Sequence, residues 1–456
     1  GGVRRERARE IVRRDRDRDR DRSIDARGRE ARDESANERT SAMNSPQRKL
    51  LKKRAAEEAS LVNADDDERD GARRGSFAAL ELKTVIRENH GAATTTHVEF
   101  ARGRGTRLSN LYATCGRRTA TVYDDEHFGD HTAVVAQYVH ETTEHQQGGN
   151  ITAVCWVRSG DDTEDEKENV AGGSTRGRGH EFGDAILAVG DENGVISVIS
   201  VTENRVVARL PAHVGGPVRD MCCASERAGR VVSVGEDGLL KVWDIFGGED
   251  GEGECVQTIN VETVASSVAC DADGKTAVTG HVQGGAVRKW KLADGAKAPK
   301  TTKGETIPTP TFKAKHPVDC VRIYGNVLYA KTRDARIETF DLAAGKRLRQ
   351  WTLPNERYRG ANASYPGPAC RFDCTSDGKF LACGDSCTSG VVYVYDTRTA
   401  ELIAELQPLR VTGVVHAAAP VDHARHVLAS YGPAVVWRYE IIPDADPRTS
   451  LEVLLK

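Results

Sequence analysis

The pattern of hydrophobic and polar positions changes near residue 80. From Leu80 onward, short runs rich in valine, isoleucine and aromatic residues alternate with glycine, aspartate and asparagine. Such runs, bounded by turn residues, are typical of β-strands. Residues 231–244 give the clearest example, because two apolar runs flank the turn Glu236-Asp237-Gly238. The pattern predicts an all-β domain built from hairpins.

The hairpins recur along the chain. We count seven groups of strands, over residues 92–140, 150–209, 213–259, 263–295, 316–353, 366–407 and 411–440. Repeats of roughly 40 residues with several strands each are typical of propeller blades. The last group lacks an outer strand, which residues 81–86, just before the first group, could supply. We therefore expect the chain to close end to end and leave no open sheet edge.

Three long segments interrupt the strand groups. They cover residues 158–182, which contain the acidic run 161–168, residues 296–315, and residues 354–367, which contain Tyr358 and Tyr365. Loops of this length inside a regular repeat are either functional or disordered, and the sequence leaves both readings open.

The N-terminal part has a different composition. Residues 1–75 contain a strict Arg-Asp alternation over residues 14–22 and almost no aromatic side chains. A polyampholyte of this kind buries too little apolar area to offset its ordering entropy. We therefore predict a disordered charged tail over residues 1–75, a propeller over 76–442 and a C-terminal tail over 443–456. A single charged helix and a nucleic-acid-binding arm are the less favoured interpretations of the first segment.

Charge, apolar runs and cysteine content argue against several classes of protein. The net charge of −3 gives no overall bias towards nucleic acid or membranes. No apolar run reaches the length of a membrane span or of a signal peptide, so neither a membrane protein nor a secreted one is expected. The 11 cysteines are scattered through strand-like segments, which is typical of reduced thiols. Cys370-x3-Cys374 and Cys383-x3-Cys387 lack the spacing and the neighbouring histidine of a zinc site, so no metal or cofactor is predicted.

Four polar residues in the third group resemble the hydrogen-bonded tetrad of a WD repeat. They are a loop histidine, a strand serine, a turn aspartate and a strand tryptophan: His213, Ser233, Asp237 and Trp243. Buried polar groups need partners, so such a tetrad fixes the geometry of its blade. The resemblance implies a seven-bladed WD40 β-propeller. The recognisable polar residues then hold structure, and no catalytic residue is predicted.

A second resemblance points to a particular family of WD-repeat proteins. The segment His316-Pro317-Val318-Asp319-Cys320-Val321-Arg322, followed by residues 325–331, resembles the fifth blade of the EED/Extra sex combs/FIE family, the WD-repeat subunits of Polycomb repressive complex 2. Further similarity lies in residues 112–116, 186–190, 381–385 and 434–439, so the resemblance spans about residues 80–440. It implies a non-catalytic nuclear scaffold whose partner is a SET-domain histone methyltransferase, with roles in histone methylation and transcriptional repression. A histone tail is a further candidate partner, whereas direct sequence-specific binding of nucleic acid is not expected.

The chain departs from this family at its binding site. The family holds trimethyl-lysine in an aromatic cage at one end of the channel, through cation–π attraction. Aligned by the flanking strands, the cage positions fall on Thr96, Thr152, Pro368 and Ala369, and none of these is aromatic. The resemblance still implies the scaffolding role, but these four positions cannot form a four-ring aromatic cage.

Two alternative functions stay open. Tyr395-Asp396-Thr397-Arg398 resembles the WDxR box with which substrate receptors dock the cullin-4 ubiquitin-ligase adaptor, so Asp396 and Arg398 are candidate docking residues. Tyrosine in place of tryptophan is a departure from that box. The chain also resembles the EED-like WD module of leucine-rich-repeat origin-associated proteins, although it contains no leucine-rich repeat.

Overall fold

The structure of this protein is a computed structural model. It describes residues 66–88, 95–101, 110–127, 131–140, 149–158, 185–248, 252–283, 285–293, 305–306, 317–354, 370–384, 390–407, 413–432 and 434–441. By internal contacts the chain divides into two units, residues 1–72 and residues 73–456. The described part of the first unit is helical, and every described strand belongs to the second.

The second unit is built from four-stranded antiparallel blades. Five of them are separate sheets, which we call blades 1 to 5 in chain order. Blade 1 contains β2 (His97–Phe100), β3 (Leu111–Gly116), β4 (Thr119–His127) and β5 (His131–Val139), and blade 2 contains β6 (Ile151–Val157), β7 (Ile186–Asp191), β8 (Val195–Ser200) and β9 (Arg205–Pro211). Blade 3 contains β10 (Val218–Cys223), β11 (Arg230–Gly235), β12 (Leu239–Asp244) and β13 (Glu254–Asn260), and blade 4 contains β14 (Ala265–Cys270), β15 (Thr276–His281), β16 (Val287–Lys291) and β17 (Glu305–Thr306). Blade 5 contains β18 (Val318–Tyr324), β19 (Val327–Thr332), β20 (Arg336–Asp341) and β21 (Arg347–Thr352).

An eight-stranded sheet contains two further blades. Blade 6 and blade 7 meet where β22 and β26 pair in parallel over two residue pairs. Their strands are β22 (Arg371–Cys374), β23 (Phe380–Gly384), β24 (Val392–Asp396) and β25 (Glu401–Leu406); and β26 (Val415–Pro420), β27 (His426–Tyr431), β28 (Val435–Ile441) and β1 (Leu80–Arg87).

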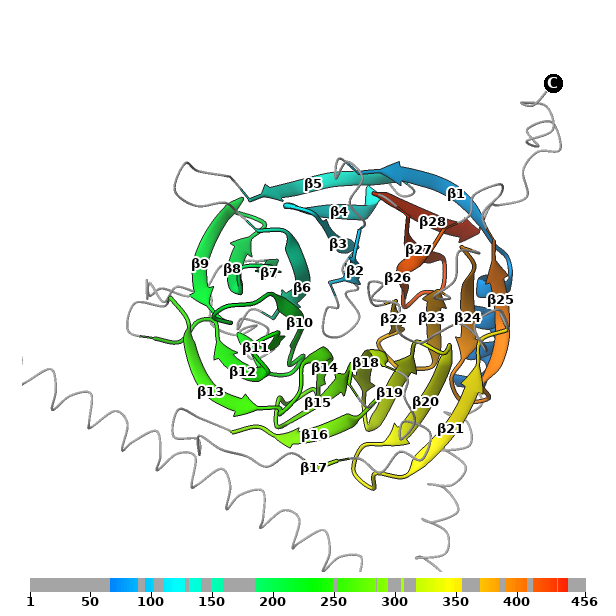
Figure 1. The fold of residues 1–456 in the computed structure, drawn as a ribbon. Helices are drawn as coiled ribbons and strands as arrows, with labels where there is room; N and C mark the ends of the chain where they lie inside the picture. The colour runs from blue at the N-terminus through cyan, green and yellow to red at the C-terminus, as the bar shows by residue number, and fades with distance from the viewer. Residues whose placement is uncertain are drawn as a thin grey trace, which may run out of the picture. The chain divides into compact units, whose positions relative to one another are not determined.

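The first strand of each blade lies nearest the centre of a closed ring (Figure 1). Going round the ring, each of these inner strands contacts the next, and the last contacts the first: β2, β6, β10, β14, β18, β22 and β26. Because each blade lies between two others, a strand such as β11 is buried along its whole length. Burial on both faces explains why these strands read as continuous apolar runs rather than alternating ones. The predicted all-β propeller is confirmed.

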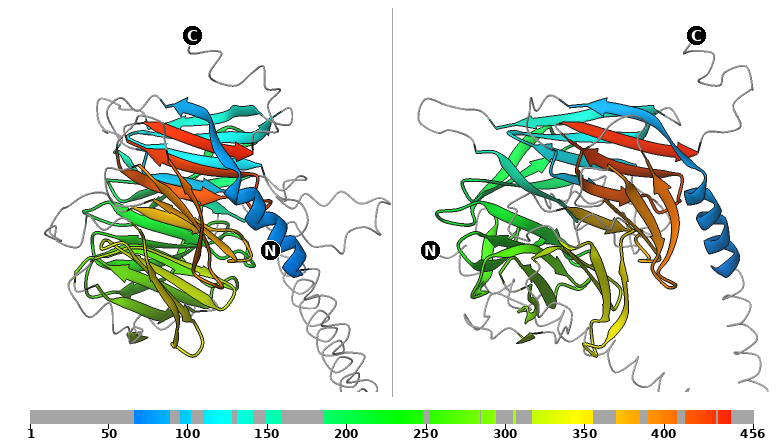
Figure 2. Two further views of the ribbon diagram at one scale, coloured as in Figure 1. Left: turned by 90° about the vertical axis from the view of Figure 1, so that its right-hand side faces the viewer. Right: turned by 45° about the vertical axis from the view of Figure 1, so that its right-hand side comes forward.

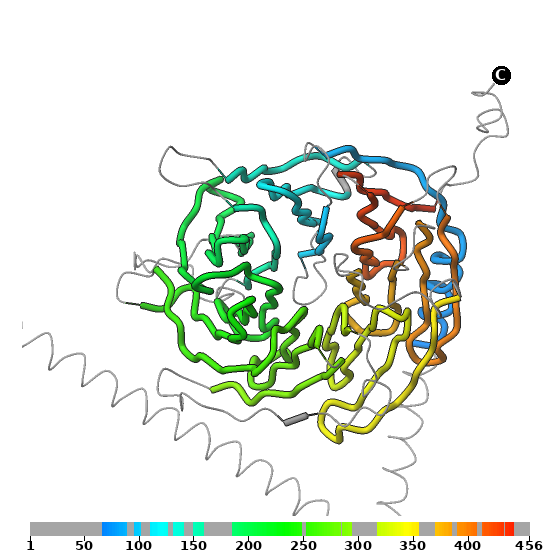
Figure 3. Tube along the Cα trace, viewed as in Figure 1, coloured from blue at the N-terminus to red at the C-terminus, as the bar shows by residue number. Residues whose placement is uncertain are grey.

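The ring closes through strands from opposite ends of the chain. β1 pairs antiparallel with β28, from Leu80 opposite Ile441 to Arg87 opposite Val435. The two strands lie side by side in both views of Figure 2, and the tube in Figure 3 runs round the ring from blue to red before the two ends meet. The prediction that residues 81–86 complete the last blade is therefore confirmed.

A buried network of charges lies at this closure. The guanidinium of Arg438 on β28 is fully buried and donates from Nε to Asp125 Oδ1 on β4 at 2.8 Å. His426 on β27 is 2.8 Å from the other oxygen of Asp125, and Arg438 also pairs with Glu440. Lys83 on β1 pairs with Glu440 from the outside. Blades 7 and 1 are thus joined by charges that all have partners, which is the condition for tolerating buried ions.

Neighbouring blades approach closely at the ends of their second strands. A Cβ atom built on Gly190 of β7 would lie 2.7 Å from the Cβ of Val218, the first residue of the next blade. Gly280 faces Val318, and Gly384 faces Val415, in the same way. Glycine is required here because any side chain would push the blades apart.

The predicted tail boundary at residue 75 is corrected by the structure. Residues 66–78 are helical. Acidic residues at the start of this helix are favourable, because they face the positive end of its dipole. Phe77 is fully buried, with its ring 5.2 Å from that of Phe380, and Arg73 pairs with Asp377 at 2.6 Å. These contacts supply the burial that the composition alone does not indicate. Residues 1–65 and 442–456 lie outside the described part.

The predicted end of blade 4 at residue 295 is also corrected. Its outer strand β17 lies inside the segment 296–315, which we expected to be an insertion. Glu305 pairs with Lys289 and Thr306 with Arg288. Two residues are too few to show a strand period in the sequence, so only pairing with β16 identifies them. The other two expected insertions lie almost wholly outside the described residues. Within the described ranges, no helix is long and apolar enough to cross a membrane.

Candidate functional sites

The structure brings the four predicted tetrad residues together between blades 2 and 3. Trp243 Nε1 donates to Ser233 Oγ at 3.0 Å, and this oxygen is 2.9 Å from His213 Nε2. His213 Nδ1 is 3.0 Å from Asp237 Oδ1, which also accepts the backbone N–H of Leu239 at 3.1 Å. Burial lowers the pKa of His213 despite the neighbouring carboxylate. The chain of contacts therefore ties the loop, the β11–β12 turn and the indole into one rigid group.

Blade 4 contains a second chain of this kind, which the sequence analysis missed. Trp290 Nε1 donates to Thr279 Oγ1 at 2.8 Å, and this oxygen is 2.8 Å from His281 Nε2. His281 Nδ1 is 2.8 Å from the hydroxyl of Thr263 in the preceding loop. The imidazole here comes from the second strand, whereas in blade 3 it comes from the loop. The signal in the sequence was Thr279-x-His281 ahead of Trp290, but a search that starts from a loop histidine passes over it.

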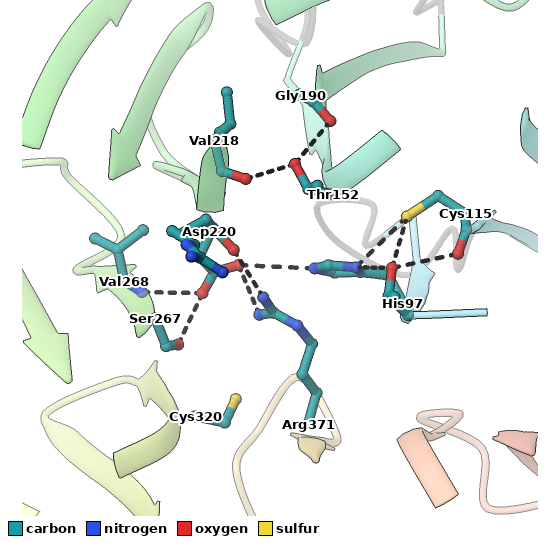
Figure 4. A network of polar contacts seen from close by, with 12 residues as sticks. His97, Cys115, Thr152, Gly190, Val218, Asp220, Ser267, Val268, Cys320 and Arg371 are labelled. Atoms are coloured by element: carbon teal, nitrogen blue, oxygen red, sulfur yellow. Dashed lines mark hydrogen bonds and ion pairs between the residues drawn. The ribbon is translucent and has the colours of Figure 1, made fainter. Parts of the chain in front are cut away.

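A polar cluster bridges the centre of the ring (Figure 4). Arg371 on β22 of blade 6 donates to Asp220 Oδ1 on β10 of blade 3 at 2.7 Å. The other oxygen of Asp220 accepts from the hydroxyl of Ser267 at 2.7 Å and from the backbone N–H of Val268 at 2.9 Å. His97 Nε2 on β2 lies 3.9 Å from Asp220 Oδ1. Asp220 thus links inner strands on opposite sides of the ring.

Burial and the neighbouring charges set the protonation states in this cluster. Although burial alone would raise it, the Arg371 guanidinium holds the pKa of Asp220 well below its usual range. Burial, reinforced by Arg371, lowers the pKa of His97 to about 4. Burial also raises the pKa of the nearby Glu99 to about 8. At neutral pH the aspartate is therefore ionised and paired, the imidazole is neutral, and Glu99 is mostly protonated.

This arrangement positions strands rather than offering open coordination positions. Both oxygens of Asp220 already accept hydrogen bonds. In the described ranges, no group of three or more histidine, cysteine or acidic side chains is placed to hold a metal ion. Cys370, Cys374 and Cys383 are buried thiols, and the thiol of Cys370 contacts Val415 O of the next blade at 2.9 Å. Their environment is that of apolar packing groups.

Thr96 and Thr152 lie where the inner strands of blades 1 and 2 begin. The hydroxyl of Thr152 donates to Val218 O of the next blade at 2.5 Å (Figure 4). Thr96 Oγ1 is 3.0 Å from His97 Nδ1. Both hydroxyls therefore serve contacts within the ring. The other two cage positions, Pro368 and Ala369, lie outside the described residues, as do Tyr358 and Tyr365.

The two candidate adaptor-docking residues have different environments. Asp396 is fully buried and 3.0 Å from Arg74 Nη1, and it also accepts the backbone N–H of Arg398 at 2.8 Å. The side chain of Arg398 is 43% exposed, with Nη2 3.6 Å from Asp396. The segment before β1 thus supplies a second arginine to the carboxylate that the docking box would use.

Comparison with known protein families gives a match in blades 2 and 3. Residues 204–244 match the family described as WD domain, G-beta repeat, a range that covers β9 to β12 and includes all four tetrad residues. A search of curated proteins found no match. WD40 domains are generally non-catalytic scaffolds that mediate protein–protein interactions. The chain therefore contains a WD40 repeat within an all-β propeller, and it is a WD-repeat protein.

Proposed function

We propose that this protein is a non-catalytic scaffold subunit of a Polycomb-type histone methyltransferase complex in the nucleus. Its role would be to bind the SET-domain subunit and support methylation of histones, and hence transcriptional repression. The observation that carries the proposal is the segment of residues 318–322, Val318-Asp319-Cys320-Val321-Arg322, which is the most specific of the motifs that resemble the EED/Extra sex combs/FIE family.

The position of this segment supports the proposal. It forms the start of β18, the inner strand of blade 5. Asp319 is buried and pairs with Lys331 at 3.4 Å and with Arg333 at 3.0 Å, and Arg322 Nη1 lies 3.7 Å from Asp220 in the central cluster. Buried ion pairs such as these limit which residues can occupy their positions, because replacing one partner leaves an uncompensated buried charge. A scaffold that presents a rigid groove to a partner helix needs such a fixed frame.

The proposed role is scaffolding without reading of methyl-lysine through the family's cage. Thr96 and Thr152 provide no aromatic face, and their hydroxyls contact neighbouring groups of the ring. The cullin-4 alternative is less favoured, because Arg74 is already paired with Asp396. No specific observation favours the origin-associated alternative.

Affinity purification of the full chain from nuclear extract, followed by mass spectrometry, tests the proposal. We expect a SET-domain methyltransferase among the partners, and we expect the purified chain to stimulate methyl transfer by that enzyme to nucleosomes. An unrelated WD-repeat propeller is the control. Recovery of the cullin-4 adaptor instead, lost in Arg398→Ala, would contradict the proposal and support the ubiquitin-ligase reading.

A further inference from the structure

Aromatic side chains fill the spaces between blades at a repeated position. The position lies on the third strand of a blade, opposite the second residue of its second strand. It is occupied by Tyr123, Trp243, Trp290, Phe340, Tyr395 and Tyr439. Each of these side chains is at most 4% exposed and packs in a cluster with apolar residues of the preceding blade.

Blade 2 departs from this rule. The equivalent position, opposite Leu187, holds Ile199. Isoleucine is much smaller than an indole or phenol ring, so it reaches less far towards blade 1. Between the two blades lies a groove of about 790 Å³, lined by residues of β4, β5, β7, β8 and β9, with Ile199 and Leu187 among them. Its volume is in the range of sites that hold ligands or side-chain anchors, roughly 300–1,000 Å³.

The polar groups of the groove are arranged from the inside outward. Ser197 is buried and 3.4 Å from the hydroxyl of Tyr138, and Asp191 is buried with its Oδ1 accepting backbone N–H groups of its own turn. The exposed charged side chains that line the groove are Arg205 and Arg209 on β9, and Arg205 is paired with Glu203 at 2.5 Å. Polar and apolar groups therefore line the groove in similar measure, with the apolar Leu187 and Ile199 near the buried Ser197, and Arg209 adds positive charge at its edge.

The edge strand β5 beside the groove has exposed apolar side chains, and Val139 among them lines the groove. β5 and β9 are the outermost strands of their sheets, and they diverge in Figure 1. Eight large apolar side chains are exposed in the described part of the chain, and three of them, Val134, Val135 and Val139, are on β5. A long apolar edge strand is a template for pairing with another chain. Clusters of exposed apolar residues beside a cavity mark interaction surfaces.

We propose that the groove between blades 1 and 2 binds a segment of a partner protein that inserts an aromatic side chain and carries acidic residues on either side of it. The aromatic ring takes the space that six other blades fill from within, and the acidic residues face Arg205 and Arg209. This interaction surface is additional to the scaffold role proposed above and does not depend on the identity of the methyltransferase.

Fluorescence anisotropy with synthetic peptides tests this inference. The probe is a labelled pentapeptide with a central tryptophan between two pairs of glutamates, titrated with the full chain. Matched probes replace the tryptophan with alanine or the glutamates with lysines. We expect saturable binding of the first probe and binding at least ~10-fold weaker for the other two, since aromatic anchors and desolvated charge pairs dominate such contacts.

Variants of the chain locate the binding site. Ile199→Trp places an indole where the other blades have a ring, and we expect it to keep the melting temperature and to abolish binding. Ala136→Phe on β5, a half-buried position that also lines the groove, is the second filling variant should the first fail to fold. Arg209→Glu should weaken binding by roughly threefold or more. Arg349→Glu, an exposed arginine on the outer strand of blade 5, is the matched control and should have no effect.

Four results would overturn the inference. The first is equal affinity for the tryptophan and alanine probes. The second is binding that persists in a folded variant with the groove filled. The third is binding that appears only when residues 159–184 are replaced by a short linker, which would make the chain's own acidic segment the occupant. The fourth is self-association of the full chain that Ile199→Trp abolishes, which would make a second copy the occupant.

Discussion

Histidine reaches the tryptophan-centred hydrogen-bond chain from two different places in this protein. In blade 3 it comes from the loop as His213, and the facing strand position is Gly235. In blade 4 that strand position is His281 itself, opposite Ala265. A Cβ atom on Gly235 would lie 2.3 Å from His213 Cγ, so the strand position and the loop histidine compete for one space.

This competition makes a prediction for Gly235→Ala. We expect the free energy of unfolding to fall by roughly 1–3 kcal/mol, because the added methyl group overpacks a buried site. The second substitution His213→Ala in the same chain should remove part of that loss, although it forfeits the tetrad. Gly75→Ala, where no atom lies within 4 Å of the new Cβ, is the control and should be neutral or slightly stabilising. Urea unfolding measures five proteins: the wild type, the single mutants Gly235→Ala, His213→Ala and Gly75→Ala, and the double mutant. An additive double mutant would contradict the steric explanation.

His97 makes the stability of the propeller depend on pH. Its imidazole is 2% exposed and contacts Asp220, Thr96 and Cys115, with the Arg371 guanidinium close by. Burial lowers its pKa from 6.5 to about 4. A depressed histidine pKa contributes stability that is fully present above pH 6.5 and is lost as the pH falls towards 4, because the unfolded chain binds the proton more readily.

We therefore expect His97→Gln to lose less stability than the wild type between pH 7 and pH 4. The difference should approach roughly 3 kcal/mol over the window, at about 1.4 kcal/mol per unit of pKa shift. His281 and His416 also have pKa values lowered to about 4, so the variant keeps a reduced acid sensitivity. Urea unfolding at several pH values provides the measurement. Parallel curves for the two proteins would contradict the prediction.

At the scale of elements, the closing strands depend on a buried network of charges. Arg438 is fully buried and pairs with Asp125 and Glu440. Arg438→Met would leave both carboxylates without their main partner, and we expect a loss of about 3–5 kcal/mol. Arg336→Met removes a pair with Asp334 in which the arginine is 41% exposed, and should cost less than about 1 kcal/mol. Chemical denaturation compares the two. Similar losses of unfolding free energy in the two variants would show that the buried closure network stabilises the protein no more than an exposed ion pair does.

The strand β1 itself provides a second test at this scale. Deleting residues 1–65 should change the melting temperature little, because the buried apolar residues of the described chain begin at Phe77. Deleting residues 1–87 removes β1 and exposes the edge of β28, and we expect this chain to unfold or aggregate. Differential scanning fluorimetry and size-exclusion chromatography distinguish the two truncations. Equal stability would mean that β1 is dispensable for closure.

At the scale of the whole molecule, binding of methylated histone tails should be weak or absent. The positions that the resemblance aligns with the family's cage are Thr96, Thr152, Pro368 and Ala369. Each missing cation–π contact is worth roughly 0.5–2 kcal/mol, so losing several should lower affinity by at least ~100-fold. Calorimetric titration with trimethylated and unmethylated peptides checks this. Micromolar binding that requires the methyl groups would contradict it, and its loss in Tyr358→Ala or Tyr365→Ala would locate substitute rings.

The sequence by itself determined the class of fold, most of its strands and the way in which the ring closes. Apolar runs between turn residues indicated the strands, because strand formation and turn geometry depend on neighbouring residues. The spare strand at residues 81–86 and the short last blade together indicated the closure. Residues 213–243 indicated a WD repeat, because the tetrad has a fixed order along the chain.

Only the tertiary structure decided which distant residues meet. Asp220 is reached by His97, Ser267 and Arg371, which lie on three other blades and have no common spacing in the sequence. Register, rather than composition, makes Tyr439 and not Trp437 the equivalent of Trp243. The groove between blades 1 and 2 lies where one blade has an isoleucine and the other six have aromatic rings, and the packing of the blades is needed to bring its lining residues together.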